Sequence, residues 1–314
     1  MRLLTVTPNV ALDRTLTVPG WRKGSIMRTD QTLARAGGKG LNVVRAANAL
    51  GLAATAVGAL GGPTGRHIAA EAEQEGLDTS WTWLDQGDSR TCLIVVDPDE
   101  PSATVINEVG PTLTANDWTR LAALVRQAAG QADVTAFCGS LPPGVSGGIF
   151  GALLDDLMAD GRALIVDSSG EALTEALSRP LWLVKVNRKE LSAALGEPLP
   201  SPSEAADAAR TILARGTRTV IVTFGAQGAI CVRREGIWWA QPPAIRSVNP
   251  IGSGDSLLAG VVAGRLRGET WPEPLILGVA CGVADALTIG QGSIRPEEVT
   301  RLREQTTIQR LTVD

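Results

Sequence analysis

The chain has 314 residues, of which 44% are hydrophobic and 20% charged, and its formal net charge is -4. This composition is ordinary for a soluble globular protein with one large or two medium domains. A slightly acidic chain lacks the basic surface that attracts nucleic acids or anionic membranes, so neither is an expected partner. The four cysteines show no metal-ligand spacing, and no run of about 18 apolar residues predicts a membrane span. We therefore expect a cytoplasmic protein with reduced thiols and no leader segment.

Short apolar runs alternate with longer runs of helical periodicity along most of the chain. The predicted elements, in chain order, are a strand at 3–10, a helix at 40–52, a strand at 54–60, a helix at 65–76, a strand at 132–140, a helix at 149–161, strands at 163–169 and 181–187, a helix at 203–216 with Ser203 as its N-cap, a strand at 219–225, and helices at 255–268 and 274–290. This alternation predicts an α/β fold whose mainly parallel sheet carries helices on both faces.

Two β-rich segments interrupt the alternation, because no crossover helix belongs to them. They cover roughly residues 14–35 and 89–110, and the second contains a predicted hairpin at 91–107 around a proline-containing turn. We expect them to form a small sheet that stands off the main sheet as a lid. The sequence contains no long linker or repeat, so residues 1–314 are predicted to form a single domain with this lid inserted in it.

Ligands of open α/β sheets bind in the loops that follow the carboxyl ends of strands. The first such loop has the sequence ARAGGKGLN and contains Gly37, Gly38, Lys39, Gly40 and Asn42. Its glycines let a ligand approach the backbone closely, and Lys39 adds a positive charge. The spacing is not that of a P-loop. A flexible turn before a helix is the alternative interpretation.

A second loop, NPIGSGDSLLAG at 249–260, precedes an apolar helix. Gly252, Ser253 and Gly254 can direct successive N–H groups at one point, where the helix adds the positive end of its dipole. This arrangement predicts an anion hole. A carboxylate at Asp255 would repel the anion, so we expect it to accept a proton from a hydroxyl that attacks phosphorus. A simple helix-start role for Asp255 is the alternative.

Three further strand ends carry candidate polar groups or glycines. They comprise Ser140, Lys185, Asn187, Glu190, Thr223, Gly225 and Gly228. A simple hairpin turn is the alternative interpretation of the stretch from Thr223 to Gly228. Glu190 can support a hydrated metal ion, or it can be only an acidic first-turn residue favoured by the helix dipole. The single histidine, His67, falls in a predicted surface helix, so a serine nucleophile would lack an obvious general base.

Taken together, these stretches resemble the PfkB/ribokinase family of carbohydrate kinases. The GGKGxN and GSGD stretches match the two family signatures in the right order, and the stretches GSLPPG, VDSSGEAL, VKVNRKEL and VTFGAQGA agree with the family as well. Asn9 and Asp13 in the first loop also fit. GSLPPG, NPIGSGDS and the lid stretch with Arg90 are most similar to the hexose-phosphate branch, which includes tagatose-6-phosphate kinase and 1-phosphofructokinase.

The resemblance implies a ribokinase-like, Rossmann-type fold and transfer of the γ-phosphate of ATP, with Mg²⁺, to a sugar hydroxyl. It implies that Asp255 is the catalytic base and that the anion hole is formed by the amides of Gly252, Ser253, Gly254 and Asp255 itself. It implies that the sugar phosphate is held by Asp13, Gly38, Lys39, Asn42, Arg90 and Ser140. It implies that Glu190 acts on the metal through water, and that the nucleotide is held by Lys185, Asn187, Thr223, Gly225 and Gly228.

The implied reaction adds a second phosphate to a ketohexose monophosphate, with tagatose 6-phosphate and fructose 1-phosphate ahead of fructose 6-phosphate. Because the lid often pairs two subunits in relatives, the resemblance also implies a homodimer formed through the lid. Two alternatives stay open: a kinase of an unphosphorylated sugar or nucleoside, and a non-catalytic regulator that binds sugar phosphates. A dinucleotide oxidoreductase is disfavoured, because no G-x-G-x-x-G follows the first strand.

Overall fold

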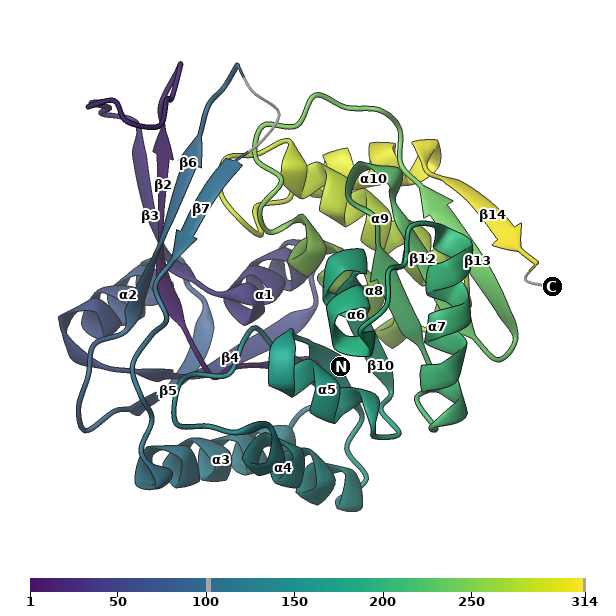
Figure 1. Ribbon diagram of the computed structural model, residues 1–314, viewed down its shortest axis with the longest axis horizontal. Coiled ribbons are helices and arrows are strands. Elements are labelled where there is room, and N and C mark those ends of the chain that lie inside the picture. The colour runs from purple at the N-terminus through teal and green to yellow at the C-terminus, as the bar shows by residue number, and fades with distance from the viewer. Residues whose placement is uncertain (100–102, 313–314) are drawn as a thin grey trace.

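The computed structural model describes residues 1–99 and 103–312, and a ten-stranded sheet runs through their centre (Figure 1). The strand order is β14-β13-β12-β11-β10-β9-β8-β1-β4-β5. The parallel part consists of β1 (Arg2–Thr7), β4 (Ala53–Leu60), β5 (Asp78–Trp83), β8 (Val134–Cys138), β9 (Leu164–Asp167), β10 (Leu183–Asn187) and β11 (Val220–Thr223). The antiparallel end consists of β12 (Ala229–Arg233), β13 (Gly236–Gln241) and β14 (Thr307–Leu311).

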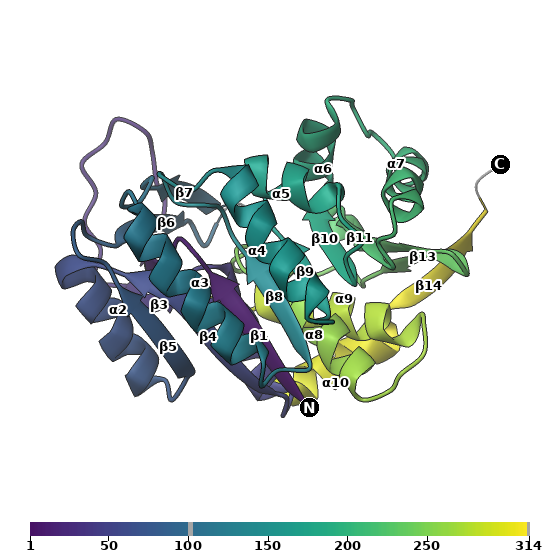
Figure 2. The same ribbon diagram turned by 90° about the horizontal axis from the view of Figure 1, so that it is seen from below.

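Helices cover both faces of this sheet, as Figure 2 shows from below. One face carries α1 (Lys39–Ala49), α2 (Gly62–Gln74), α8 (Ser253–Leu266), α9 (Glu273–Ala286) and α10 (Pro296–Gln305). The other face carries α3 (Ala115–Ala129), α4 (Gly147–Ala159), α5 (Gly170–Leu177), α6 (Arg188–Leu195) and α7 (Pro202–Ala214). The predicted doubly covered, mainly parallel α/β architecture is therefore confirmed.

The apolar strands build two cores at once, because successive side chains of a strand point to opposite faces of the sheet. In β11, Ile221 packs into the core beneath α8 and α9, whereas Val220 and Val222 pack into the core beneath α7. Leu3 and Leu4 of β1 divide in the same way. Both faces of the central strands are buried, which explains their continuous hydrophobic sequence.

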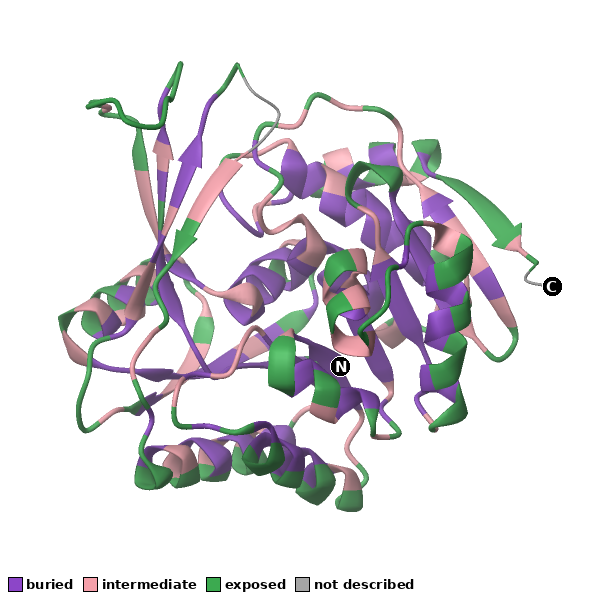
Figure 3. Cartoon of the chain, viewed as in Figure 1, coloured by how far each residue is buried: buried purple, intermediate pink, exposed green. Residues whose placement is uncertain are grey.

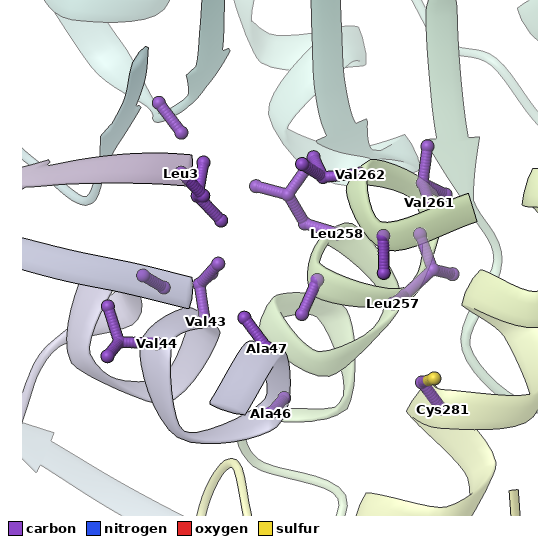
Figure 4. Packing of buried hydrophobic residues seen from close by; sticks show 14 of the residues in the cluster. Leu3, Val43, Val44, Ala46, Ala47, Leu257, Leu258, Val261, Val262 and Cys281 are labelled. Carbon is purple, nitrogen blue, oxygen red and sulfur yellow. The ribbon is translucent and has the colours of Figure 1, made fainter. Parts of the chain in front are cut away.

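Helices α1 and α8 pack against one another on the first face. Val43 and Ala47 of α1 share one core cluster with Leu257, Leu258 and Val261 of α8, and Figure 4 shows these side chains close together. This apolar packing fixes the first turns of the two helices relative to one another. The polar residues that begin both helices are held in place by it.

The interrupted β segments form a second, four-stranded sheet with the order β3-β2-β6-β7. Its strands are β2 (Ala11–Thr17), β3 (Thr32–Gly37), β6 (Arg90–Val96) and β7 (Ala103–Asn107). The small sheet rises from one end of the main sheet at the upper left of Figure 1, and much of its outer part is exposed in Figure 3. The expected lid and the antiparallel pairing of the hairpin at 91–107 are confirmed. Part of the hairpin's predicted turn, residues 100–102, lies outside the described residues.

Two details of the sequence prediction need correction. Ser203 does not cap the helix predicted at 203–216, because Ser201 accepts the N–H of Glu204 at 3.3 Å and forms a capping box with it, so that α7 starts at Pro202. Six elements were not predicted, namely β5, α3, α5 (Gly170–Leu177), β13, α10 and β14, although Thr114 and Asp117 form a capping box at the start of α3. Among the residues that the structure describes, no helix combines the length and the apolar character that a membrane crossing requires.

Candidate active site

A buried group of charges lies where the carboxyl ends of β9 and β10 meet the first turns of α1 and α8. Asp167, the last residue of β9, is completely buried and accepts hydrogen bonds from Lys39 Nζ (2.8 Å) and Lys185 Nζ (2.7 Å). Lys39 also lies 3.4 Å from Glu190 Oε1. A buried charge is stable only when it is paired, and here one carboxylate pairs with two ammonium groups.

The charge states of this group follow from its burial and its partners. Burial by itself would favour neutral Asp167, but Lys185 and Lys39 keep the pKa of its carboxyl below the ordinary value. Burial also opposes the charge on Lys39, yet Asp167, Glu190 and Asp255 together raise the pKa of the Lys39 ammonium above its ordinary value. Both residues are therefore ionised at neutral pH, and Lys39 retains its positive charge throughout the physiological range.

Asp255, the third residue of α8, points into the same space. Its Oδ2 accepts a hydrogen bond from Asn42 Nδ2 at 2.8 Å. Burial, reinforced by the neighbouring Asp167 carboxylate, raises the pKa of Asp255 to about 6, against the opposing effects of Lys185, Lys39 and Asn42. A carboxylate with such a pKa is mostly deprotonated at neutral pH and can take up a proton there, as a general base must.

The four amides predicted to form the anion hole differ in whether they already have a backbone partner. Gly252 has a φ of 94°, which favours glycine, and its carbonyl already accepts the N–H groups of Asp255 (2.9 Å) and Ser256 (3.0 Å). The N–H of Ser253 makes a long bond of 3.4 Å to the Pro250 carbonyl. Within the described part of the chain, the amides of Gly252 and Gly254 have no such partner. A Cβ at Gly254 would lie 2.7 Å from Lys185 Nζ, so an ammonium group stands directly beside Gly254.

A second group of predicted residues lies at the base of the lid. Asp13 of β2 is buried, and burial raises its pKa to about 6, although Arg45, Arg90 and the N–H of Gly38 oppose this. A side chain at Gly37 would overlap the Asp13 carboxyl, so the glycine leaves it room. Arg90 begins β6 and donates from Nε to the Asn9 carbonyl (3.2 Å) and from Nη1 to the Glu108 carbonyl (3.3 Å).

The remaining predicted residues lie along neighbouring strand ends. Asn187 and Thr223 are paired across β10 and β11, and Gly225 begins the short 3₁₀ turn that leads to Gly228. Asn187 also caps α6, in a capping box with Glu190. Ser140 follows β8 and is half-buried.

His67 lies on the surface of α2 and pairs with Glu71 at 3.3 Å, as the surface-helix interpretation predicts. This histidine is therefore no base for the site.

Comparison with known proteins identifies the family of this chain. The family model described as pfkB family carbohydrate kinase matches residues 1–298. This chain belongs to the pfkB family.

Its relatives include the 1-phosphofructokinase of Escherichia coli K12, which is 32% identical over 93% of this chain and 92% of that protein. The 1-phosphofructokinase of Bacillus subtilis is 30% identical over 96% of this chain and all of that protein. The structure of phosphofructokinase-2 from E. coli in complex with substrates and products matches with a TM-score of 0.88 and 28% identity, over 97% of this chain and 99% of that one.

These findings confirm the predicted family and the ribokinase-like α/β fold with its small sheet. The protein is a pfkB-family sugar kinase related to 1-phosphofructokinases, and kinases of this family use ATP and sugar phosphates. The identity of about 30% leaves the acceptor sugar and the role of each site residue to proposal and experiment.

The site of this pfkB-family kinase has carboxylates suited to Mg²⁺. Asp167 Oδ1 and Glu190 Oε1 flank one cation already, the Lys39 ammonium, at 2.8 and 3.4 Å. Among the described residues there is no group of three His, Cys, Asp or Glu side chains that could hold a metal ion alone. Mg²⁺ commonly binds through one or two carboxylates, water and substrate phosphates, so this pair fits such an ion.

The sequence prediction did not include Asp167 among the site residues, although Asp167 accepts hydrogen bonds from two residues that were predicted, Lys39 and Lys185. Its local signals were an acidic residue at the end of the buried strand sequence LIVD and its place in the stretch VDSSGEAL, which resembles the family. Lys39 and Lys185 were assigned to the sugar and to the nucleotide respectively, and the structure brings both of them to this one carboxylate. The two predicted subsites therefore meet at Asp167.

Proposed function

We propose that this kinase transfers the γ-phosphoryl group of ATP to a hydroxyl of a ketohexose monophosphate. Fructose 1-phosphate is the first candidate, because it is the substrate class named by the curated relatives, and tagatose 6-phosphate and fructose 6-phosphate follow. The observation that carries the proposal is the buried Asp255, held by Asn42 at the first turn of α8 and faced by Lys39 and Lys185.

In the proposed reaction, Asp255 accepts the proton of the sugar hydroxyl, and the hydroxyl oxygen forms a bond to the γ-phosphorus. The bond from that phosphorus to its bridging oxygen breaks, and ADP leaves with the electron pair. Asn42 engages Oδ2 of Asp255, which leaves Oδ1 for the hydroxyl. Lys39, Lys185 and the open amide of Gly254 stabilise the developing negative charge, which is the main contribution a protein makes to phosphoryl transfer.

The acceptor is bound at the base of the lid in this proposal. Asp13 accepts hydrogen bonds from sugar hydroxyls, together with Ser140 and the backbone around Gly38. Arg90 binds the phosphate that the sugar already carries. Its Nε and Nη1 are held by carbonyl groups, so the guanidinium is oriented before the substrate arrives and Nη2 can reach an anion.

The nucleotide is bound along the ends of β10 and β11, by Asn187, Thr223, Gly225 and Gly228, with Lys185 directed at its phosphates. Asp167 and Glu190 would hold Mg²⁺ through water, and the bound ion would neutralise charge on the transferring phosphate. Lys39 would then exchange a carboxylate partner for a phosphate oxygen.

We also propose that residues 1–314 act as one domain with an inserted lid, and that two copies pair through their lids. The segment between β2 and β3 exposes Trp21, Ile26 and Met27, and β7 exposes Ile106. Exposed apolar groups of this kind mark contact surfaces. ATP and sugar phosphates are cytoplasmic metabolites, and we expect the kinase to act in that compartment.

A coupled assay of ADP release tests the proposed acceptor. Purified protein with Mg-ATP is offered fructose 1-phosphate, tagatose 6-phosphate, fructose 6-phosphate, free fructose and free ribose. We expect turnover to be highest with one of the sugar phosphates. Turnover restricted to a free sugar would refute the role of Arg90 and favour a kinase of unphosphorylated sugars. Sugar phosphate binding without turnover on any acceptor would favour the regulator.

A further inference from the structure

The amide of Asn42 is held at both of its ends. Nδ2 donates to Asp255 Oδ2 at 2.8 Å, while Oδ1 accepts from Arg45 Nη1 at 3.0 Å. A primary amide can turn by 180° about its last bond, and would then direct its oxygen at the Asp255 carboxylate. The second hydrogen bond decides between these two orientations, because only an oxygen can accept from the guanidinium of Arg45.

Arg45 is itself held rigidly. It lies three residues after Asn42, on the same side of α1, and its side chain is only 6% exposed. Glu75, which caps the C-terminal end of α2, engages the guanidinium at two points, Nε to Oε2 and Nη2 to Oε1 (2.9 Å). Nη2 also donates to the carbonyl of Ala36, next to the glycine loop. A planar guanidinium fixed in this way has one nitrogen left, and that nitrogen is directed at Asn42.

The same guanidinium affects the second buried carboxylate of the site. The charges of Arg45 and Arg90 oppose the effect of burial on the pKa of Asp13. Arg45 thus acts on Asp13 by charge and on Asp255 through a hydrogen-bonded neighbour. Glu75 also lies 3.4 Å from Arg35 of β3, so the ion pair joins α1 and α2 to a strand of the lid.

We propose that Arg45, held by Glu75, is a positioning residue for phosphoryl transfer. It fixes the amide of Asn42 so that the NH₂ group faces Asp255, and this holds Oδ2 and leaves Oδ1 directed at the acceptor hydroxyl. The inference rests on the proposed role of Asp255 as the base. A purely structural ion pair would contribute to stability alone, so the tests must separate stability from the state of Asp255.

The first test is a double-mutant cycle on kcat with Arg45→Lys and Asn42→Ala. Lysine keeps the positive charge but has one ammonium group in place of the three-nitrogen guanidinium, so it cannot bind Glu75 and Asn42 at the same time. We expect Arg45→Lys to lower kcat about 10- to 100-fold, as for a misplaced catalytic group, with a smaller change in the KM for ATP. If Arg45 acts through Asn42, the double variant is no slower than Asn42→Ala; additive losses would overturn the proposal.

A matched control is Arg179→Lys. Arg179 is also largely buried and binds the Asp155 carboxylate at two points (2.8 and 2.9 Å), but it follows α5 and is remote from Asp255. This variant should lose stability while keeping kcat within about twofold, because an ion pair far from the active site contributes to folding and not to catalysis. A loss of kcat equal to that of Arg45→Lys would assign the effect to general destabilisation.

The second test needs no turnover. A ¹³C NMR titration of the aspartate side chains, assigned with Asp255→Asn, follows the protonation of Asp255 without substrate. The charged groups that face Asp255 are Asp167, Lys185, Lys39 and Asp285, and all of them stay in place in Arg45→Lys. We expect the pKa of Asp255 to rise in this variant, because a misoriented amide no longer stabilises the carboxylate.

Glu75→Gln provides a second variant in case Arg45→Lys does not fold, and it should shift the pKa in the same direction by less. An unchanged Asp255 pKa in every folded variant of this pair would overturn the inference. The titration also separates the two proposals. If the wild-type protein phosphorylates no acceptor, the proposed function fails, but the titration still decides whether Arg45 controls Asp255 through Asn42.

Discussion

Replacing Asp255 with asparagine should abolish most activity and, at neutral pH, stabilise the fold. Asparagine has nearly the same shape, and its carbonyl can accept the hydrogen bond from Asn42 that Oδ2 accepts now. It cannot take a proton from a hydroxyl, so we expect kcat to fall by about 10²- to 10⁴-fold. ATP binding should persist, because the nucleotide contacts are made by other strands.

The stability effect follows from the pKa of the buried carboxyl. Folding raises the pKa of Asp255 from 3.8 to about 6. The folded state therefore holds this proton more tightly than the unfolded state, and stability falls as pH rises between these two values. Above pH 7 the charged carboxylate lowers the free energy of unfolding by the full amount, about 3 kcal/mol for a shift of two pKa units. Near pH 5 the loss is about half as large. The asparagine variant avoids that cost, so its advantage should grow with pH.

Urea unfolding at pH 5 and pH 7.5 measures this difference, and the coupled assay measures kcat on the same samples. The variant should gain up to about 3 kcal/mol at pH 7.5 and roughly half as much at pH 5. In the wild type, kcat/KM should rise with pH through about 6 as Asp255 loses its proton. Near-wild-type turnover of the variant would refute the assignment of Asp255 as the base. A stability difference that does not depend on pH would refute the raised pKa of the buried Asp255 carboxyl.

Three further predictions test the rest of the site. Arg90→Ala should raise the KM for the sugar phosphate about 10- to 100-fold and leave that for ATP nearly unchanged, since it removes a charge-assisted hydrogen bond; equal effects on both would make Arg90 structural. Gly252→Ala should lower thermal stability by about 1–3 kcal/mol and reduce kcat, because φ is 94° and a Cβ would lie 2.8 Å from Asp285 Oδ2; unchanged melting would contradict this. Ile26→Asp, on a side chain 90% exposed in the lid, should convert dimer to monomer in light scattering, whereas Ile149→Asp on α4 should not; a wild-type monomer would end the lid-dimer proposal.

Local signals were sufficient to predict the strand ends that carry the site. The glycines before Asp255 mark a turn into a helix, and the run GGKG does the same for α1. Because parallel strands end at one edge of the sheet, any polar residue placed at such an end was bound to lie near the others. The family signatures added the chemistry, and each of these features is contained in a few consecutive residues.

Long-range pairings could not be predicted in this way. Asp167 bonds to a lysine 128 residues away and to another 18 residues away, and both contacts depend on the order of β8, β9 and β10 in the sheet. Arg45 was not among the predicted site residues, because a charged residue within a helix is usually solvent-exposed. Its burial is tolerable because Glu75 at the end of α2 pairs with it. The sequence also does not show which of the predicted anion-hole amides already has a partner in the first helical turn, as the amide of Asp255 does.

Under the proposed function an acidic chain binds two polyanions, and the buried charges account for this. The formal net charge is -4, so attraction has to come from a few cations at the right place. Lys39 and Lys185 both donate to Asp167, which keeps the two ammonium groups ordered beside the first turn of α8. A phosphate entering beside Gly254 competes with a carboxylate for ammonium groups that are already positioned, and the entropy of ordering them has been spent in folding. In the proposed reaction, Asp167 keeps the two lysines in position, whereas Asp255, whose pKa is about 6, exchanges a proton.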